Sequence, residues 1–356
     1  MTDTTAYAAL GDRVLVVRET NGDSDTGEAV GGWTAAERLV GRDLQCVAAS
    51  TERPERALVG TVESGVHRTL DGGDTWKRVD AAIDDRVTSI AVSPHDPDVV
   101  WAGTEPSAVY RSTDGGDSWE ALPPLSDLPS ESEWAFPPRP HTHHVRWLEP
   151  DPHDPGRLYV AIEAGALVRT TDALTATAAD GTDGAETWED RPEGARYDNH
   201  SLATHPDAEG RVYTAAGDGY AQSADGGDSW ASPQDGLGHR YVWGLAVPHS
   251  DPDTVVVSAA SGPRSAHTVS TAESYVYRTT NAGRDESTEW DLAMDGLPEP
   301  EGTVRSVFAA AEESVLFALN NRGLYRSVDA GASWKRVPLE WPGSYEGQTP
   351  RGLAVV

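Results

Sequence analysis

One short sequence, STDGGDSW at Ser112–Trp119, recurs along this chain. Its other clear copies stand at Leu70–Trp76 (LDGGDTW), Ser223–Trp230 (SADGGDSW) and Arg326–Trp334 (RSVDAGASW), and longer or decayed copies end at Trp188, Trp290 and Trp33. The last of these reads RETNGDSDTGEAVGGW. A phrase that recurs this often is either a repeated ligand site or a repeated piece of architecture.

The tryptophans that end these copies are regularly spaced. From Trp33 to Trp334 the successive intervals are 43, 43, 69, 42, 60 and 44 residues, and the two long intervals contain insertions. A period of 42 to 44 residues suits one four-stranded blade of a β-propeller. Seven tryptophans therefore predict an all-β, seven-bladed β-propeller, a single domain over residues 1–356.

Each repeat shows the same order of strands and turns. In the third repeat, strands are expected at residues 86–94, 99–104, 107–113 and 118–122, separated by turns rich in Asp, Gly and Pro. The final segment, Thr349–Val356, matches an inner strand with no blade after it. It is therefore expected to complete the first blade, about residues 1–40 plus 349–356, and so to protect a strand edge.

The repeated phrase is interpreted as a self-contained turn. Asp114 can accept hydrogen bonds from its own turn, Gly115 and Gly116 allow positive φ, and Trp119 can pack on the neighbouring sheet. The phrase resembles the Asp box, Ser-x-Asp-x-Gly-x-x-Trp, of the bacterial neuraminidase repeat propellers. In that family the boxes lie opposite the ligand pocket, which implies a structural role, rather than a calcium-binding or catalytic one, for Asp71, Asp114, Asp225, Asp329, Trp76, Trp119, Trp230 and Trp334.

Composition restricts the partners. The formal net charge is −30, and Lys77 and Lys335 are the only lysines. Such a charge favours a protein of the salt-rich cytoplasm of a halophile, where salt screens self-repulsion; an acidic mesophilic protein is the alternative. The sequence shows no basic stripe of the kind that binds nucleic acid, so we expect no nucleic-acid partner. It also shows no signal peptide and no apolar segment long enough to span a membrane, so we expect no membrane association. Cys46 is expected to be a buried, inert thiol in a monomer.

The binding face is predicted from loop lengths. Three outer-to-inner connections use ten residues, whereas residues 120–144 form one of 25, and residues 261–274 form a long loop between the second and third strands of blade six. Long loops on a rigid scaffold often carry binding residues. Alignment of the inner strands gives one column, hereafter the mouth column: Gln45, Thr88, Arg146, His200, Trp243, Arg305 and Arg351.

Three arginines in one column favour a carboxylate or phosphate pocket, because each guanidinium keeps its charge and presents a planar fork of donors. Pairing of these arginines with neighbouring acids is the alternative. The further candidates on the same face are His144 and His239 for ligand binding, Glu163 and Tyr241 for catalysis, His141, His143 and His144 for a divalent metal, and Glu105, Asp218 and Tyr197 nearby.

The resemblance implies three functional precedents. Sialidases hold a substrate carboxylate with an arginine triad and use a Tyr nucleophile with Glu and Asp. Xyloglucan-cleaving glycosidases pair two propellers, and photosystem II assembly factors bind protein partners through arginine-rich patches. The chain is also similar to sortilin-like Asp-box propellers. The preferred hypothesis is binding of an anionic small molecule, glycan or acidic peptide over blades four to six, with no cofactor. A glycoside hydrolase is the first alternative. A protein scaffold, favoured by a mouth plugged by residues 120–143 and an exposed apolar patch around Trp134, is the second.

Overall fold

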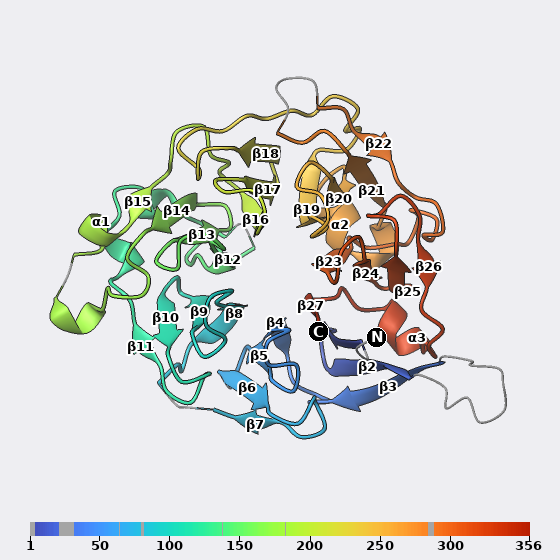
Figure 1. The fold of residues 1–356 in the computed structure, drawn as a ribbon, viewed down its shortest axis with the longest axis horizontal. Coiled ribbons are helices and arrows are strands. Elements are labelled where there is room, and N and C mark those ends of the chain that lie inside the picture. The colour runs from blue at the N-terminus through green and yellow to red at the C-terminus, as the bar shows by residue number, and fades with distance from the viewer. Residues whose placement is uncertain are drawn as a thin grey trace.

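The computed structural model describes residues 4–20, 32–63, 65–79, 82–136, 138–181, 183–283 and 288–356. The described strands form seven small antiparallel sheets arranged around a central axis (Figure 1). The predicted all-β, seven-bladed propeller is therefore confirmed. Most of the copy RETNGDSDTGEAVGGW, residues 21–31, lies outside the described residues.

The strands of each blade follow one another from the central axis outward. From inner to outer strand, blades one to three are β27 (Gly352–Val355), β1 (Thr5–Ala9), β2 (Val14–Thr20), β3 (Gly32–Arg38); β4 (Leu44–Ala49), β5 (Ala57–Thr61), β6 (Val66–Thr69), β7 (Lys77–Arg78); and β8 (Arg86–Val92), β9 (Val100–Glu105), β10 (Val109–Ser112), β11 (Glu120–Ala121). Blades four and five are β12 (Val145–Pro150), β13 (Leu158–Ile162), β14 (Ala166–Thr170), β15 (Glu189–Asp190); and β16 (Asn199–Thr204), β17 (Val212–Ala216), β18 (Gly219–Ser223). Blades six and seven are β19 (Tyr241–Ala246), β20 (Val255–Ala260), β21 (Ser274–Thr279), β22 (Asp291–Leu292); and β23 (Val307–Ala310), β24 (Leu316–Asn320), β25 (Gly323–Ser327), β26 (Lys335–Arg336).

The ring closes as expected. β27 pairs with β1 from Ala6↔Val355 to Ala9↔Gly352, so the two ends of the chain share blade one. Blade five differs from expectation, because its fourth strand is reduced to the single bridge Gln222↔Ala231. Pro233 follows shortly after and has no amide hydrogen with which to extend the ladder.

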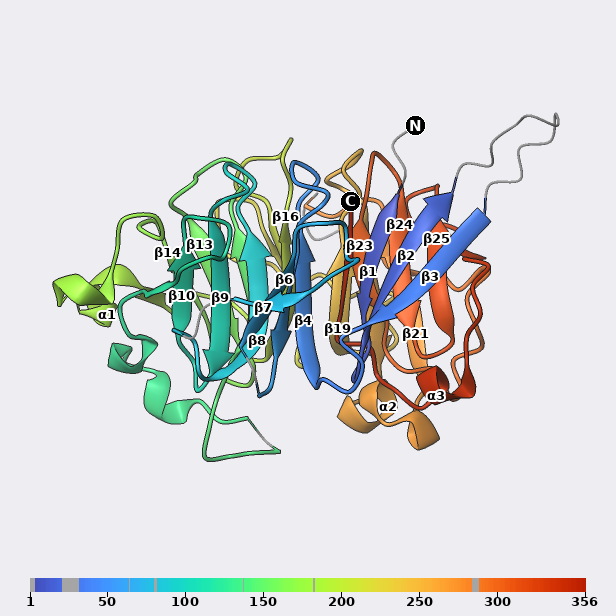
Figure 2. The same cartoon turned by 90° about the horizontal axis from the view of Figure 1, so that it is seen from below.

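Short helices occupy the connections. They are η1 (Leu125–Asp127), η2 (Glu131–Glu133), η3 (Ala178–Asp180), α1 (Gly184–Thr187), α2 (Pro263–His267), η4 (Val269–Thr271) and α3 (Gly343–Glu346). None of the described helices is long and apolar enough to cross a membrane. α2 and α3 lie on one face of the ring, and the C-terminus lies toward the other (Figure 2). Because β27 is an inner strand that ends at this other face, the inner strands begin on the α2 face.

The four clear copies of the repeated turn share one hydrogen-bond pattern. In the copy around Asp114, one carboxylate oxygen accepts bonds from Ser112 Oγ (2.8 Å) and the Ser118 amide (2.8 Å), and the other accepts one from Ser118 Oγ (2.6 Å). The same bonds recur at Asp71, Asp225 and Asp329. Gly115 and Gly116 have φ of 71° and 93°. These carboxylates are engaged by their own turns, at the end of the strands away from α2.

The tryptophans of these turns join neighbouring blades. Trp76 of blade two meets Tyr7 of blade one edge to face, with ring centroids 6.1 Å apart. Trp119 of blade three packs on a cluster that includes Leu58 of blade two and Val100 of its own blade. The repeated turn therefore fixes its own hairpin through Asp and the adjacent blade through Trp.

Replacing Asp329 by alanine is expected to lower the free energy of unfolding by about 1–2 kcal/mol, because three hydrogen bonds of an exposed turn are lost. Those bonds lower the pKa of Asp329 although partial burial opposes them. A lowered pKa in the folded state means that this stabilisation is present above the ordinary pKa of aspartate and is lost as the pH falls through the lowered value.

Urea unfolding of Asp329→Ala at neutral and acid pH measures this effect. The matched control is Asp291→Ala, which removes an exposed carboxylate from β22. The free energies of unfolding of the two variants should differ at neutral pH and become similar in acid. Equal stability at neutral pH would show that the turn does not depend on its carboxylate.

Candidate functional site

β-Bulges place the mouth column on the central axis. The pairing of each of β4, β8, β12, β16 and β19 with its neighbour skips one residue, and the skipped residues are Gln45, Thr88, Arg146, His200 and Trp243. A bulge re-aims the side chain of the extra residue. Arg305 and Arg351 stand just before β23 and β27, so all seven residues occupy equivalent positions at the α2 face.

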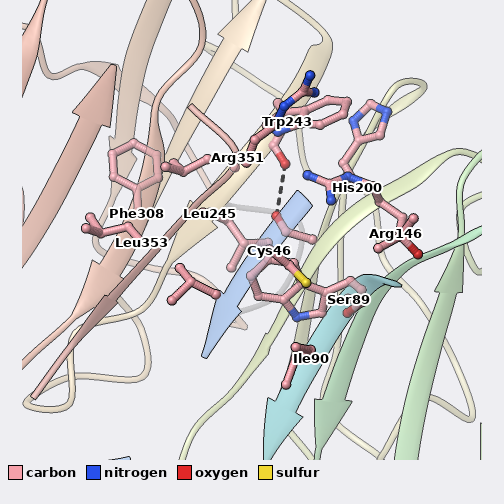
Figure 3. A pocket seen from close by; sticks show the side chains of 17 residues that line it. Cys46, Ser89, Ile90, Arg146, His200, Trp243, Leu245, Phe308, Arg351 and Leu353 are labelled. Carbon is pink, nitrogen blue, oxygen red and sulfur yellow. Dashed lines mark hydrogen bonds between the residues drawn. The ribbon is translucent and has the colours of Figure 1, made fainter. Parts of the chain in front are cut away.

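A cavity lies on the axis and is lined by residues of all seven inner strands. Five mouth-column residues line it, namely Thr88, Arg146, His200, Trp243 and Arg351, whereas Gln45 and Arg305 are not among the lining residues. The remaining lining residues are Cys46, Val47, Ser89, Ile90, Trp147, Ser201, Gly244, Leu245, Val307, Phe308, Gly352 and Leu353. Figure 3 shows the labelled nitrogen-bearing side chains toward one end of this cavity and the labelled aliphatic side chains toward the other.

Trp243 contacts two of the three arginines. The guanidinium carbons of Arg146 and Arg305 are 4.7 Å and 4.6 Å from the centre of its ring. Both distances fall within the range of cation–π attraction. The rings of His200 and His267 are each 4.2 Å from that of Trp243. Arg146 and Arg305 therefore both contact the ring of Trp243.

Arg305 is a buried cation without an acidic partner. Its side chain and backbone together are 1 % exposed, and its Nε and Nη1 atoms have no hydrogen-bond partner among the described residues. Burial lowers its pKa well below the usual value, and the charges of Arg146 and Arg351 lower it further. Its amide donates to the carbonyl oxygen of Ala266 in α2 (2.8 Å). Such a group is costly unless something pairs with it.

The other two arginines are only weakly compensated. Arg146 Nε lies 3.7 Å from Glu163 Oε2 and has no hydrogen-bond partner in the described part of the chain. Arg351 is exposed and forms no ion pair within the described ranges. Glu163 is therefore the only carboxylate within ion-pair distance of these three arginines among the described residues.

Glu163 is engaged by the protein itself. His144 Nε2 lies 3.1 Å from Glu163 Oε2. Burial opposes ionisation of Glu163, but the hydrogen bond from His144 and the charges of His144, His200 and Arg146 lower its pKa to about 2. Glu163 is therefore an anion that is held in place, and it does not line the cavity.

The predicted metal histidines turn to different neighbours. His141 is exposed, His143 Nε2 lies 3.2 Å from Glu131 Oε1, and His144 contacts Glu163. A different group has the chemistry for a divalent ion, because one atom each of Glu163, Asp198 and His200 lie within 4.8 Å of one another. Arg146 and His144 already face Glu163 there, so the ion would compete with two resident partners.

Tyr241 is a poor nucleophile in this arrangement. Its hydroxyl oxygen lies 3.1 Å from His267 Nε2. Burial and the charges of Glu163 and Asp198 raise its pKa. Burial, followed by the charges of Arg305 and His200, lowers the pKa of His267 to about 2. The pair is therefore a neutral Tyr–His contact under α2.

Several predicted residues lie outside the cavity. His239 stacks on Tyr275 with ring centroids 4.1 Å apart. Gln45 Nε2 donates to Asp43 Oδ1 (2.9 Å). The acids and the tyrosine of the neighbouring loops have partners of their own: Glu105 pairs with Arg139 and Arg86, Asp218 with Arg196, and the Tyr197 hydroxyl donates to Glu133.

The expected apolar patch around Trp134 is wrong. Trp134 is 5 % exposed and belongs to a core cluster with Leu125 and Leu128. Its Nε1 donates to Ser130 Oγ (2.8 Å). Because these apolar side chains anchor residues 120–144 to blades three and four, no described residue of that loop lines the cavity.

Sequence reasoning missed His267 and the apolar part of the cavity. His267 belongs to the 261–274 loop, which was selected for its length alone. The apolar part had a readable signal, because the residue two places after each mouth-column residue is aliphatic: Val47, Ile90, Leu148, Leu202, Leu245, Val307 and Leu353.

Comparison with known proteins supports the fold. No protein-family model and no curated protein sequence matches the chain. An ancestral GH74 enzyme superposes with a TM-score of 0.61 at 15% identity, over 85% of this chain and 39% of that one. The GH74 enzyme of Niastella koreensis gives 0.61 at 14% identity, over 92% of this chain and 54% of that one, so the chain spans about half or less of either enzyme.

A solved structure of YCF48 bound to D1 peptide is similar over most of its length. The TM-score is 0.55 at 18% identity, and the match covers 83% of this chain and 82% of that one. At such identities the likeness establishes the propeller fold alone.

Proposed function

We propose that this chain is a binding protein of the Asp-box propeller type, whose central mouth holds the anionic group of a ligand between Arg146, Arg305 and Arg351. The observation that carries the proposal is Arg305, a guanidinium that is 1 % exposed and has no acidic partner among the described residues. A buried, unpaired charge is expensive. A ligand carboxylate or phosphate would accept its free N–H groups and remove that cost.

The lining of the cavity favours binding over hydrolysis. Glycoside hydrolysis by the usual route needs a pair of carboxyl groups about 5–9.5 Å apart across the substrate. No Asp or Glu is among the described residues that line the cavity. Glu163, the predicted catalytic acid, is already held by His144. The GH74 and YCF48 likenesses are thus arguments for the propeller fold, and a peptide, such as the one in the YCF48 structure, is one proposed source of the anionic group.

The proposed setting is the salt-rich cytoplasm of a halophile, and the support is the net charge of −30 with two lysines. Most side-chain cations of the chain are arginines that form local ion pairs, as in Arg169 with Glu189 and Asp228. Arg305 departs from this pattern, because it is buried and forms no ion pair among the described residues, and a bound anion would be its partner.

Thermal unfolding with a panel of compounds tests the proposed function. The panel contains acetate, phosphate, a sialic acid, a uronic acid and a neutral xyloglucan oligosaccharide, each applied to the wild type and to an Arg146→Ala, Arg305→Ala double variant. At a concentration about 100 times the Kd, a bound anion stabilises the fold by about 2.7 kcal/mol. We expect anions to raise the melting temperature of the wild type by several degrees and to leave the double variant unchanged.

The matched control is Arg139→Ala, which removes an arginine of the same face that Glu105 already pairs, and it should respond like the wild type. Equal shifts in the wild type and the double variant would contradict the proposal, as would the absence of any shift. Release of sugar from a sialoside or xyloglucan would establish the hydrolase alternative instead.

A further inference from the structure

The cavity carries a second chemical feature below its cationic mouth. Val47, Ile90, Leu245, Val307 and Leu353 line it, together with Phe308 and Cys46. The five aliphatic residues stand two positions after the mouth column in five blades, about 6.8 Å further along strands of ordinary rise. These five aliphatic side chains therefore form a belt around the axis, hereafter the aliphatic ring. It lies below the level of the mouth-column arginines, hereafter the cationic ring.

Two polar side chains of the lining, Thr88 in the mouth column and Ser201 just below it, are used by the protein. Thr88 Oγ1 donates to the carbonyl oxygen of Val145 (2.6 Å), and Ser201 Oγ donates to that of Trp243 (2.9 Å). Burial raises the pKa of Cys46 to about 12, so its thiol is neutral and behaves as a small apolar group. A sugar that entered this part of the cavity would lose hydrogen bonds to water and regain few, whereas an alkyl chain would lose none.

We propose that the ligand is a monocarboxylate with an unbranched aliphatic chain of medium length. Its carboxylate lies at Arg146 and Arg351, the two arginines that line the cavity, with the buried Arg305 near them, and its chain runs down the axis past Val47, Ile90, Leu245, Val307 and Leu353. This inference rests on the proposed anion site and adds the class of molecule that the site accepts. The span between the two rings is roughly the length of a pentyl segment, so a chain shorter than this does not reach the aliphatic ring.

Calorimetric titration with potassium acetate, butanoate, hexanoate and octanoate tests the assignment. Each methylene that leaves water contributes about 0.8 kcal/mol at full burial, which corresponds to roughly fourfold in Kd. Because a chain must reach the aliphatic ring, butanoate should bind about as tightly as acetate, and each methylene beyond hexanoate should increase the affinity about two- to fourfold, so that octanoate binds roughly 4- to 16-fold more tightly than hexanoate. Octylammonium, with the same chain and the opposite charge, should not bind.

The matched variant is Val47→Thr, Val307→Thr, which keeps the shape of two partly buried lining residues and adds two hydroxyl groups. Its affinity for acetate should equal that of the wild type, and its affinity for octanoate should fall roughly tenfold, because the hydroxyls face an alkyl chain. If the affinities for acetate and octanoate fall equally, the substitutions have disturbed the fold. The variant then no longer supports the proposed position of the alkyl chain.

The outcomes separate the two levels of the proposal. If acetate binds and the affinity does not increase with chain length, the anion site stands and the aliphatic ligand is wrong. If none of the four carboxylates binds, the proposed function itself fails. If octylammonium binds as tightly as octanoate, the cavity is only an apolar site and both proposals are overturned.

Discussion

Replacing Arg305 by methionine is expected to raise the melting temperature of the ligand-free protein. Most buried-residue replacements destabilise a protein, so this direction is unusual. The reason is that Arg305 is 1 % exposed, lacks an acidic partner within the described ranges and stands near Arg146 and Arg351. Methionine has a similar length and removes the desolvated charge.

The gain is expected to be about 1–4 kcal/mol, the range seen when buried charges are replaced by apolar side chains of similar volume. Loss of the contact with Trp243 at 4.6 Å offsets part of it, because a desolvated cation–π pair is worth about 2 kcal/mol. Denaturant unfolding of the wild type and the variant, without added carboxylate or phosphate, measures the difference.

Arg111→Met is the matched control. Arg111 is also buried, at 5 % exposure, but its Nε donates to Glu120 (3.0 Å) and its Nη1 to the carbonyl oxygen of Ala173 (2.8 Å). Its replacement should therefore destabilise the protein. If both replacements destabilise the protein, the unpaired charge of Arg305 is not a cost to the ligand-free fold. That result would contradict the proposal that Arg305 lacks a ligand as its partner.

The melting temperature is expected to rise steeply with KCl. At a net charge of −30, self-repulsion opposes the compact state. The Debye length falls from about 10 Å at 0.1 M salt to about 3 Å at 1 M, which removes most of this repulsion. We expect an increase of about 10 °C or more between these concentrations, concentrated in the lower part of the range.

A variant with less charge serves as the control. Glu52→Gln, Glu209→Gln, Asp291→Asn and Glu340→Gln replace four exposed carboxylates that form no ion pair in the described structure, and change the net charge from −30 to −26. Its melting temperature should depend less on KCl than that of the wild type. A melting temperature independent of KCl in both proteins would exclude charge repulsion as a main cost of this fold.

The propeller could be predicted from the sequence because its repeat has a fixed physical cause. Each clear copy contains the Asp that holds the turn and the Trp that contacts the next blade, and their period equals one blade. The closure by β27 could also be predicted from the unmatched strands at the two ends. The short outer edge of blade five could not, since it depends on how far pairing continues before Pro233.

The candidate site was predictable in part. Alignment of the inner strands selected Arg146, His200, Trp243, Arg305 and Arg351. The alignment remains correct despite the β-bulges, because five blades carry the bulge at the same column. Which acids pair with which arginines depends on side chains far apart in the sequence, so the engagement of Glu163 by His144 could not be foreseen. The burial of Trp134 had the same cause, because its contacts come from two blades.

The most direct test of the account is a titration of the wild type and Arg305→Met with acetate labelled with ¹³C at the carboxyl carbon, followed by NMR across acid pH. The account predicts a bound resonance in the wild type whose carboxyl group stays ionised below the pKa of free acetate, because guanidinium groups stabilise its charge. It predicts no bound resonance in Arg305→Met. A bound carboxylate that titrates like free acetate, or that binds both proteins equally, would contradict the claim that this mouth is an anion site.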